Sequence, residues 1–187
     1  PLGNCCVAAP PVLVFDQSGN LVRAWGGPGA GYEWPESEHG IFVDGTDSVW
    51  LAGNGDKDSQ VLKFTLDGKF LLQIGRSGQS RGSNDTANLG SPADLYVDVP
   101  AREVYVADGY RNRRVVVFDS ETGAYKRHWG AYGARPSDDP TPAYDPKAPP
   151  SRQFGNPVHC VRPTRDGLVY VCDRVNDRFQ IFRKDGT

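Results

Sequence analysis

Short runs of apolar, β-branched residues alternate with polar turns along the whole chain. The clearest example is Val104–Val106, followed by an Asp-Gly break and then by Val115–Phe118. The same order of strand, turn and strand returns at 169–182 and, in looser form, at 49–64. No stretch shows the 3.6-residue period of an amphipathic helix. The pattern therefore predicts an all-β protein in which one antiparallel unit is repeated.

Each complete unit is expected to contribute four strands. In the unit at 39–75 these strands fall at 41–43, 49–51, 61–64 and 70–74. A second complete unit covers 91–130, residues 157–187 have the first three strands of another, and residues 11–26 supply half a unit. The phenylalanine that ends the third strand recurs at Phe15, Phe64, Phe118 and Phe182, a period of roughly fifty residues or a little more. This period predicts a β-propeller with four-stranded antiparallel blades, and residues 1–187 are expected to form a single partial propeller domain.

Composition and charge narrow the choice of partners. The 22 Gly and 15 Pro fall between the apolar runs, as expected for many tight turns. A net charge of -2 provides no basic surface, so nucleic acid is not an expected partner. Arg111, Arg113 and Arg114 form a local cluster that we expect to be a solvated strand edge. No run reaches the roughly 18 apolar residues that a membrane span needs.

The cysteines and the chain ends give two further expectations. Adjacent Cys5 and Cys6 cannot form an ordinary disulfide with each other without strain, and Cys160 and Cys172 fall in or beside core strands, where buried free thiols are expected. The chain begins with Pro, contains no Met and starts with half a unit, while a strand at 179–182 would leave an unpaired edge. We therefore expect a fragment, the rest of the propeller being supplied by missing chain or by another copy.

Chain topology predicts that the long loops and the candidate functional side chains lie at one end of the blades. In an antiparallel blade, the start of the first strand, the end of the second and the connection between blades all lie at the same end. His39 and His159 open first strands, Tyr110 and Arg174 follow second strands, and the long segments 27–38, 76–90 and 131–156 connect blades. These four side chains are expected to gather on the loop-rich face, where functional sites are usually built.

The residues at these positions carry a family resemblance. The pattern from Pro92 through Val104-Tyr-Val-Ala-Asp to Val115-Val-Val-Phe resembles NHL repeats, which form β-propellers commonly of six blades. Landmarks at 74–77, 91–94, 107–110, 129–130 and 172–174 are similar to those of peptidyl-α-hydroxyglycine α-amidating lyase, in a bacterial-type form, from about His39 to the end. The family's cysteines are replaced by Arg111, Tyr170 and Ile181, so its disulfides are not carried over.

The resemblance implies a catalytic pair. Tyr110 matches the lyase's catalytic base, which takes the proton from the hydroxyl of an α-hydroxyglycine, and Arg174 matches a cation that favours the phenolate. A free phenol loses its proton only near pH 10, so a base of this kind needs such a cation. The alternative is a tyrosine stacked in a loop and an arginine bound to loop carbonyls. Asp108 and Asp173 recur after second strands and are expected to cap turns rather than to catalyse.

The resemblance also implies metal sites. His39 and His159 match two zinc ligands, and Ile41 matches a position whose backbone carbonyl holds calcium; the family's third histidine and first arginine would lie outside this chain. Counting back ten residues from Val49, Val104 and Val169 reaches His39, Asp94 and His159, so we expect these three to share one register and point the same way. Asp94 is therefore a further channel candidate. The alternative is that His39 and His159 are simply polar residues at the first positions of strands, at the rim of the blades, and bind no metal.

Two classes of function remain. One is a metal-assisted lyase that cleaves a carbinolamide C–N bond of a small peptide, with zinc and calcium as cofactors. The other is a non-catalytic NHL propeller that binds a peptide, a glycan or a small ligand on its loop-rich face. The resemblance places the protein in the periplasm or outside the cell. Whether Tyr110, Arg174, His39 and His159 converge on one point distinguishes the two classes.

Overall fold

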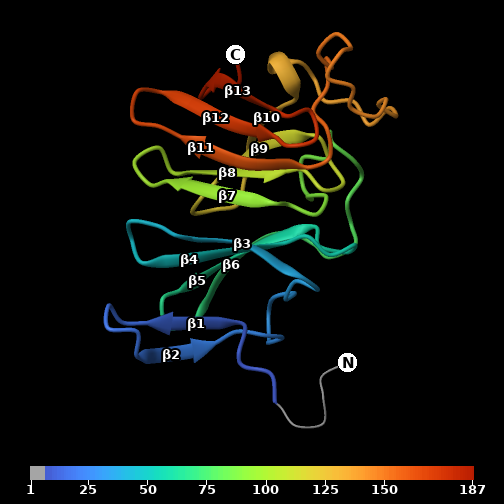
Figure 1. Ribbon diagram of the computed structural model, residues 1–187. Helices are drawn as coiled ribbons and strands as arrows, with labels where there is room; N and C mark the ends of the chain where they lie inside the picture. The colour runs from blue at the N-terminus through green and yellow to red at the C-terminus, as the bar shows by residue number, and fades with distance from the viewer. Residues whose placement is uncertain (1–6) are drawn as a thin grey trace.

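The computed structural model describes residues 7–187, which form thirteen strands in four antiparallel sheets (Figure 1). The first sheet contains β1 (Val12–Phe15) and β2 (Leu21–Trp25); the second contains β3 (Glu38–Val43), β4 (Ser48–Gly53), β5 (Gln60–Thr65) and β6 (Phe70–Gly75). The third contains β7 (Asp94–Asp98), β8 (Glu103–Asp108), β9 (Arg114–Asp119) and β10 (Tyr125–Trp129); the fourth contains β11 (Val158–Pro163), β12 (Leu168–Asp173) and β13 (Arg178–Arg183). Apart from one short 3-10 turn, η1 (Ala131–Gly133), the described chain has no helix. The predicted all-β propeller is confirmed.

The sheets are stacked side by side as the blades of a propeller (Figure 1). Their first strands lie together, β3 against β7 and β7 against β11, and therefore form the inner wall of the blades. The hairpin turns between first and second strands lie along the left of Figure 1, and the long connections 76–90 and 131–156 lie along the right. One face of the blades therefore carries only short hairpin turns, and the opposite face, the loop-rich face, carries the long connections.

Apolar side chains from facing blades form three cores between the sheets. One lies between β1–β2 and the second sheet, around Phe64; a second lies between the second and third sheets, around Phe118; a third lies between the third and fourth sheets, around Phe182. These are three of the four phenylalanines that set the sequence period. The sequence repeat therefore reflects packing between blades, because each of these rings is buried in the core between one blade and its neighbour.

The aspartates that follow second strands hold the loops together. Asp108 accepts the backbone N–H of Gly90 at 2.7 Å, and Asp173 accepts that of Gly155 at 2.8 Å, in both cases eighteen residues earlier in the chain. Asp108 also accepts from the Asn112 amide. The aspartates therefore have a structural role, but it differs from the predicted capping of their own turns. Each carboxylate binds an asparagine side chain in its own turn, and its backbone contact is with the loop that enters the blade.

The prediction of a solvated arginine cluster is wrong for Arg114. Its guanidinium is fully buried and forms an ion pair of 2.8 Å with the equally buried Asp108. It also donates to the carbonyls of Ser83 and Asn88 in the loop 76–90. Arg111 is exposed, as expected. Because a loop folds over the end of β9, the tertiary structure encloses the arginine that sequence placed at a strand edge.

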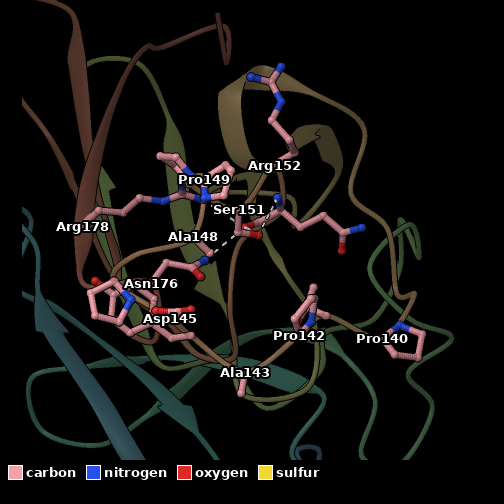
Figure 2. Close-up of a pocket in the computed structure, with 15 residues that line it drawn as sticks. Pro140, Pro142, Ala143, Asp145, Ala148, Pro149, Ser151, Arg152, Asn176 and Arg178 are labelled. Atoms are coloured by element: carbon pink, nitrogen blue, oxygen red, sulfur yellow. Dashed lines mark hydrogen bonds between the residues drawn. The ribbon is translucent and has the colours of Figure 1, made fainter.

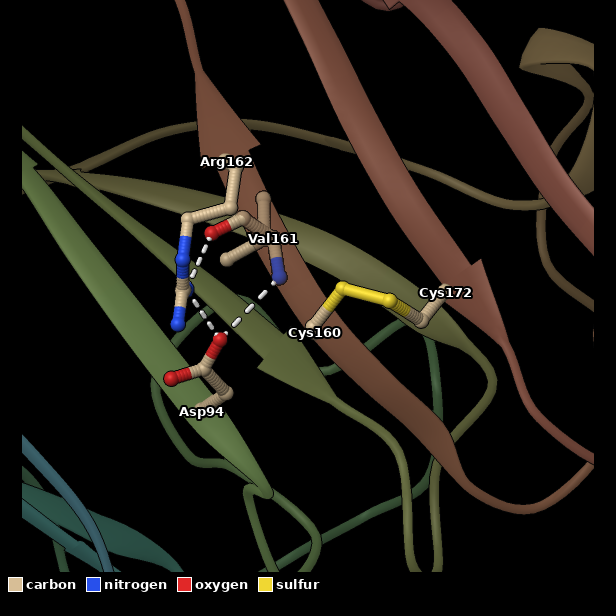
Figure 3. The surroundings of a disulfide bond; sticks show 5 residues. All are labelled: Asp94, Cys160, Val161, Arg162 and Cys172. Atoms are coloured by element: carbon tan, nitrogen blue, oxygen red, sulfur yellow. Dashed lines mark hydrogen bonds and ion pairs between the residues drawn. A yellow bond between two sulfur atoms is a disulfide. The ribbon is translucent and has the colours of Figure 1, made fainter.

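The prediction of free thiols at Cys160 and Cys172 is also wrong. The two residues are direct partners on β11 and β12, with their Cα atoms 4.9 Å apart, and they form a disulfide (Figure 3). Strand pairing explains the error, because residues opposite each other in an antiparallel pair meet at a distance that a disulfide spans. Cys5 and Cys6 lie outside the described residues. Within residues 7–187 no helix is long and apolar enough to cross a membrane.

Removing this disulfide is expected to lower the free energy of unfolding by about 2–4 kcal/mol, because the unfolded chain gains entropy when the cross-link opens. The measurement compares thermal unfolding of the wild type with and without reductant, and of the double variant Cys160→Ser, Cys172→Ser. We expect reductant to lower the midpoint of the wild type and to leave the double variant unchanged. Equal midpoints for oxidised and reduced wild type would contradict the stabilising role of this pair.

Candidate functional site

Three aromatic side chains from three different blades meet on the loop-rich face. The Tyr110 Oη lies 3.1 Å from the His39 Nε2 and 3.3 Å from the His159 Nε2. The two imidazole rings are 5.5 Å apart, centre to centre, and stand nearly perpendicular. The Arg174 guanidinium carbon lies 5.8 Å from the centre of the Tyr110 ring, within the range of a cation–π contact. The four residues predicted to gather on one face therefore lie around a common point.

Both histidines occupy β-bulges. In the pairing of β3 with β4, Glu38 faces Gly53 and Gly40 faces Ala52, so His39 is an extra residue. In the pairing of β11 with β12, the ladder likewise skips His159. A bulge turns the side chain of its extra residue away from the regular alternation. The same irregularity in two blades therefore directs both imidazoles to the site.

Two glycines allow the blades to approach closely enough for this arrangement. A Cβ on Gly109 would lie 2.0 Å from the carbonyl oxygen of Val158, and a Cβ on Gly40 would lie 3.1 Å from that of Ala93. Any side chain at Gly109 would push β8 away from β11, because the contact is with backbone on both sides. Gly109 precedes Tyr110 and Val158 precedes His159, so this backbone contact fixes the distance between the two functional side chains.

Hydrogen bonds set the chemical state of the imidazoles and the position of the Tyr110 turn. The His39 Nδ1 donates to the carbonyl of Ala93 at 2.6 Å, which leaves Nε2 as the acceptor in the neutral ring. Burial, followed by the positive charge of Arg174, lowers the pKa of His159 and favours the neutral ring. The Asn156 amide donates to the carbonyls of Gly109 and Asn112 at 2.9 and 2.8 Å and so clamps the turn that carries Tyr110.

Asp94 does not share the register of the histidines, so that prediction is wrong. It faces Ala107, as Gly40 faces Ala52 and Cys160 faces Cys172 in the other blades. The reason is the turn between first and second strands. Residues 99–102 separate the paired Asp98 and Glu103, whereas only residues 45–47 separate Asp44 and Ser48. A count of ten residues therefore ends one position further along β7 than along β3 or β11.

The Asp94 carboxylate is engaged elsewhere. It accepts the backbone N–H of Val161 at 3.2 Å and forms an ion pair with Arg162 (Figure 3). These contacts join β7 to β11 just beyond the Cys160–Cys172 disulfide. Asp94 and the disulfide thus hold, from two sides, the strand that presents His159.

Zinc and calcium binding stay predictions, and the donor atoms at the site show which residues could take part. His39 and His159 direct two nitrogen atoms to one point, and the Ala93 carbonyl provides the outer hydrogen bond that metal-bound imidazoles usually make. Among residues 7–187 no group of three His, Cys, Asp or Glu side chains could hold a metal ion. Ile41 lies on β3 with an exposed side chain, and its role as a carbonyl ligand of calcium stays a prediction.

Sequence reasoning missed the bulges, the two close glycines and the clamp by Asn156. One signal was available for the bulge on β11. The buried Val158 and Val161 are three residues apart, whereas one face of a regular strand repeats every two residues. This break in the alternation marks the place where His159 is inserted. Nothing comparable in the local sequence identifies Gly109 or Asn156, because their partners lie in another blade.

Comparison with known proteins agrees with this architecture. The sequence model of the NHL repeat matches residues 89–118. NHL repeat-containing protein 3 of Mus musculus is 31% identical over 184 residues, which is 94% of this chain and 46% of that protein. Peptidyl-glycine alpha-amidating monooxygenase of Mus musculus is 30% identical over 149 residues, which is 79% of this chain and 14% of that protein. The chain thus spans less than half the length of these relatives, and it belongs to the NHL-repeat family of β-propeller proteins.

Proposed function

We propose that this propeller cleaves the C–N bond of a peptide ending in α-hydroxyglycine, releasing a peptide amide and glyoxylate. The observation that carries the proposal is the meeting of the Tyr110 hydroxyl with two imidazole nitrogens at 3.1 and 3.3 Å beneath the Arg174 cation. A similarity of 30% to an amidating monooxygenase supports it independently.

In this proposal Tyr110 is the base. As phenolate it takes the proton from the hydroxyl of the α-hydroxyglycine, the C=O bond of glyoxylate forms, and the C–N bond breaks. The departing amide nitrogen takes up this proton from Tyr110, which returns to the phenolate, so that the products are a neutral amide and an aldehyde. Arg174 is the cation that favours the phenolate by its fixed positive charge.

His39 and His159 are the residues that would hold a zinc ion, through Nε2. When bound, zinc would supply Lewis-acid polarisation of the substrate oxygen. Two imidazoles are fewer than the three protein ligands usual in a catalytic zinc site, so the proposal includes a further ligand beyond the described residues. Calcium at the Ile41 carbonyl is proposed on the family resemblance alone.

We propose further that the protein acts in the periplasm or outside the cell. The Cys160–Cys172 disulfide supports an oxidising compartment, because disulfides rarely persist in a reducing cytoplasm. A peptide or small molecule is the proposed ligand, and the net charge of -2 supports excluding nucleic acid.

The deciding experiment measures glyoxylate release from an α-hydroxyglycine peptide by the full-length protein. We expect turnover with zinc present, and a loss of turnover after chelation that added zinc restores. Absence of glyoxylate under metal-replete conditions would instead favour a propeller that binds a ligand without reaction. NHL repeat-containing protein 3, which matches across 94% of the chain, supports the propeller scaffold that this second function also requires.

A further inference from the structure

A cavity of about 460 Å³ lies inside the long connection that follows β10, a volume in the usual range of ligand pockets. Figure 2 shows the chain running around it, with Pro140 and Pro142 on one side and Ala148 and Pro149 on the other. Part of the wall also comes from Asn176, in the turn between β12 and β13, and from Arg178, the first residue of β13. The cavity is therefore built by the loop together with the blade that carries Arg174.

Proline restricts the backbone of this loop. Five of the eleven residues 140–150 are proline, and each proline ring fixes its own φ angle. The base of the loop is also anchored, because the Gln153 carbonyl accepts hydrogen bonds from Ser151, Asn176 and Arg178 at 3.0, 3.1 and 3.0 Å. A preformed cavity loses little conformational entropy on binding.

The cavity is tied to the Tyr110 turn through a short series of hydrogen bonds. The Arg113 guanidinium donates to the Gln153 side chain at 3.2 Å and to the Asn156 side chain at 2.7 Å. Asn156 in turn holds the carbonyl of Gly109, next to Tyr110. On the other side, Asn176 is two residues from Arg174. The cavity is therefore connected both to the turn that carries Tyr110 and to the turn that carries Arg174.

Apolar groups of proline, alanine and Tyr144 form most of the wall, so the cavity fits an apolar side chain better than a charged one. We propose that it receives an apolar side chain of the peptide substrate, from a residue a few positions before the C-terminal α-hydroxyglycine. This inference rests on the proposed function and deepens it, since it names the substrates that the site prefers.

The test uses the full-length protein and a set of α-hydroxyglycine peptides with Gly at all upstream positions, or with one Phe at the first, second, third or fourth of them. We expect kcat/KM to be about 10-fold higher for Phe at one position than for the all-Gly peptide, the size expected for burying an aromatic side chain. Ala148→Trp, which fills the cavity from an exposed loop position, is expected to abolish that preference by lowering kcat/KM for the Phe peptide to the value for the all-Gly peptide. Ala101→Trp, on the β7–β8 turn at the opposite face, is the matched control.

Equal kcat/KM for every peptide in the wild type would overturn the inference, as would an equal effect of Ala148→Trp on the Phe and all-Gly peptides. A failure of the proposed function is separately recognisable, because then the all-Gly peptide also gives no glyoxylate. In that case calorimetry with unreactive peptides ending in ordinary glycine still tests the cavity. Tighter binding of one Phe peptide that Ala148→Trp removes would support it, and equal binding of all peptides would overturn it.

Discussion

Tyr110→Phe is expected to lower the rate of glyoxylate release by about 10²-fold or more, the usual effect of losing a general base. The substitution removes only the hydroxyl that lies 3.1 and 3.3 Å from the two imidazole nitrogens. The ring remains beside Arg174 and His39, so the free energy of unfolding is expected to change by no more than about 1 kcal/mol. Turnover and thermal unfolding of the same preparation test both parts.

The chain offers a matched control in Tyr125→Phe. The Tyr125 hydroxyl also contacts an imidazole, the His128 Nδ1 at 2.8 Å, but on the outer strand β10. We expect this variant to keep wild-type turnover. Arg174→Ala is expected to lower turnover to a similar extent as Tyr110→Phe, because the cation beside the Tyr110 ring is gone. Unchanged turnover in Tyr110→Phe would reject Tyr110 as the base.

Arg114→Ala is expected to lower the free energy of unfolding by about 3–5 kcal/mol, the cost of leaving one partner of a buried ion pair uncompensated. Asp108 would keep its negative charge in a fully buried position, and the carbonyls of Ser83 and Asn88 would lose their donor. For a chain of this length such a loss corresponds to a fall of roughly 10 °C in the unfolding midpoint. Urea unfolding of the purified variant measures it.

Arg111→Ala is the control for this substitution, since it removes an exposed arginine from the same turn. It is expected to cost less than about 1 kcal/mol. A double variant, Asp108→Asn with Arg114→Met, is expected to recover part of the loss, because it removes the unpaired charge together with its partner. Equal costs for Arg114→Ala and Arg111→Ala would contradict the structural role given to the buried pair.

The alternation of apolar and polar residues was sufficient to predict the repeat. It identified the strands because the side chains of a strand point alternately to opposite faces, and each blade buries both faces against its neighbours. The terminal phenylalanines were informative for the same reason, since Phe64, Phe118 and Phe182 each lie in a core between blades. Antiparallel connectivity also predicted that His39, His159, Tyr110 and Arg174 would gather on one face.

The errors at Asp94, Arg114 and the cysteine pair arose where a residue's environment comes from another part of the chain. Asp94 was placed by counting residues, and a turn longer by one residue shifted it out of the predicted register. Arg114 was judged from its polar neighbours in sequence, although it is buried by a loop whose Ser83 carbonyl lies 31 residues earlier. The pairing of Cys160 with Cys172 depended on the register of β11 with β12.

The sequence by itself determined the all-β repeat, the blade order and the face on which polar side chains collect, because these follow from local alternation and from chain direction. The tertiary structure alone decided that the side chains meet within 3.1 and 3.3 Å. That distance depends on two bulges and on the contact between Gly109 and the backbone of Val158. Contacts between the backbones of different blades produce no periodic pattern in the sequence. The geometry of the site therefore follows only from the way the blades pack together.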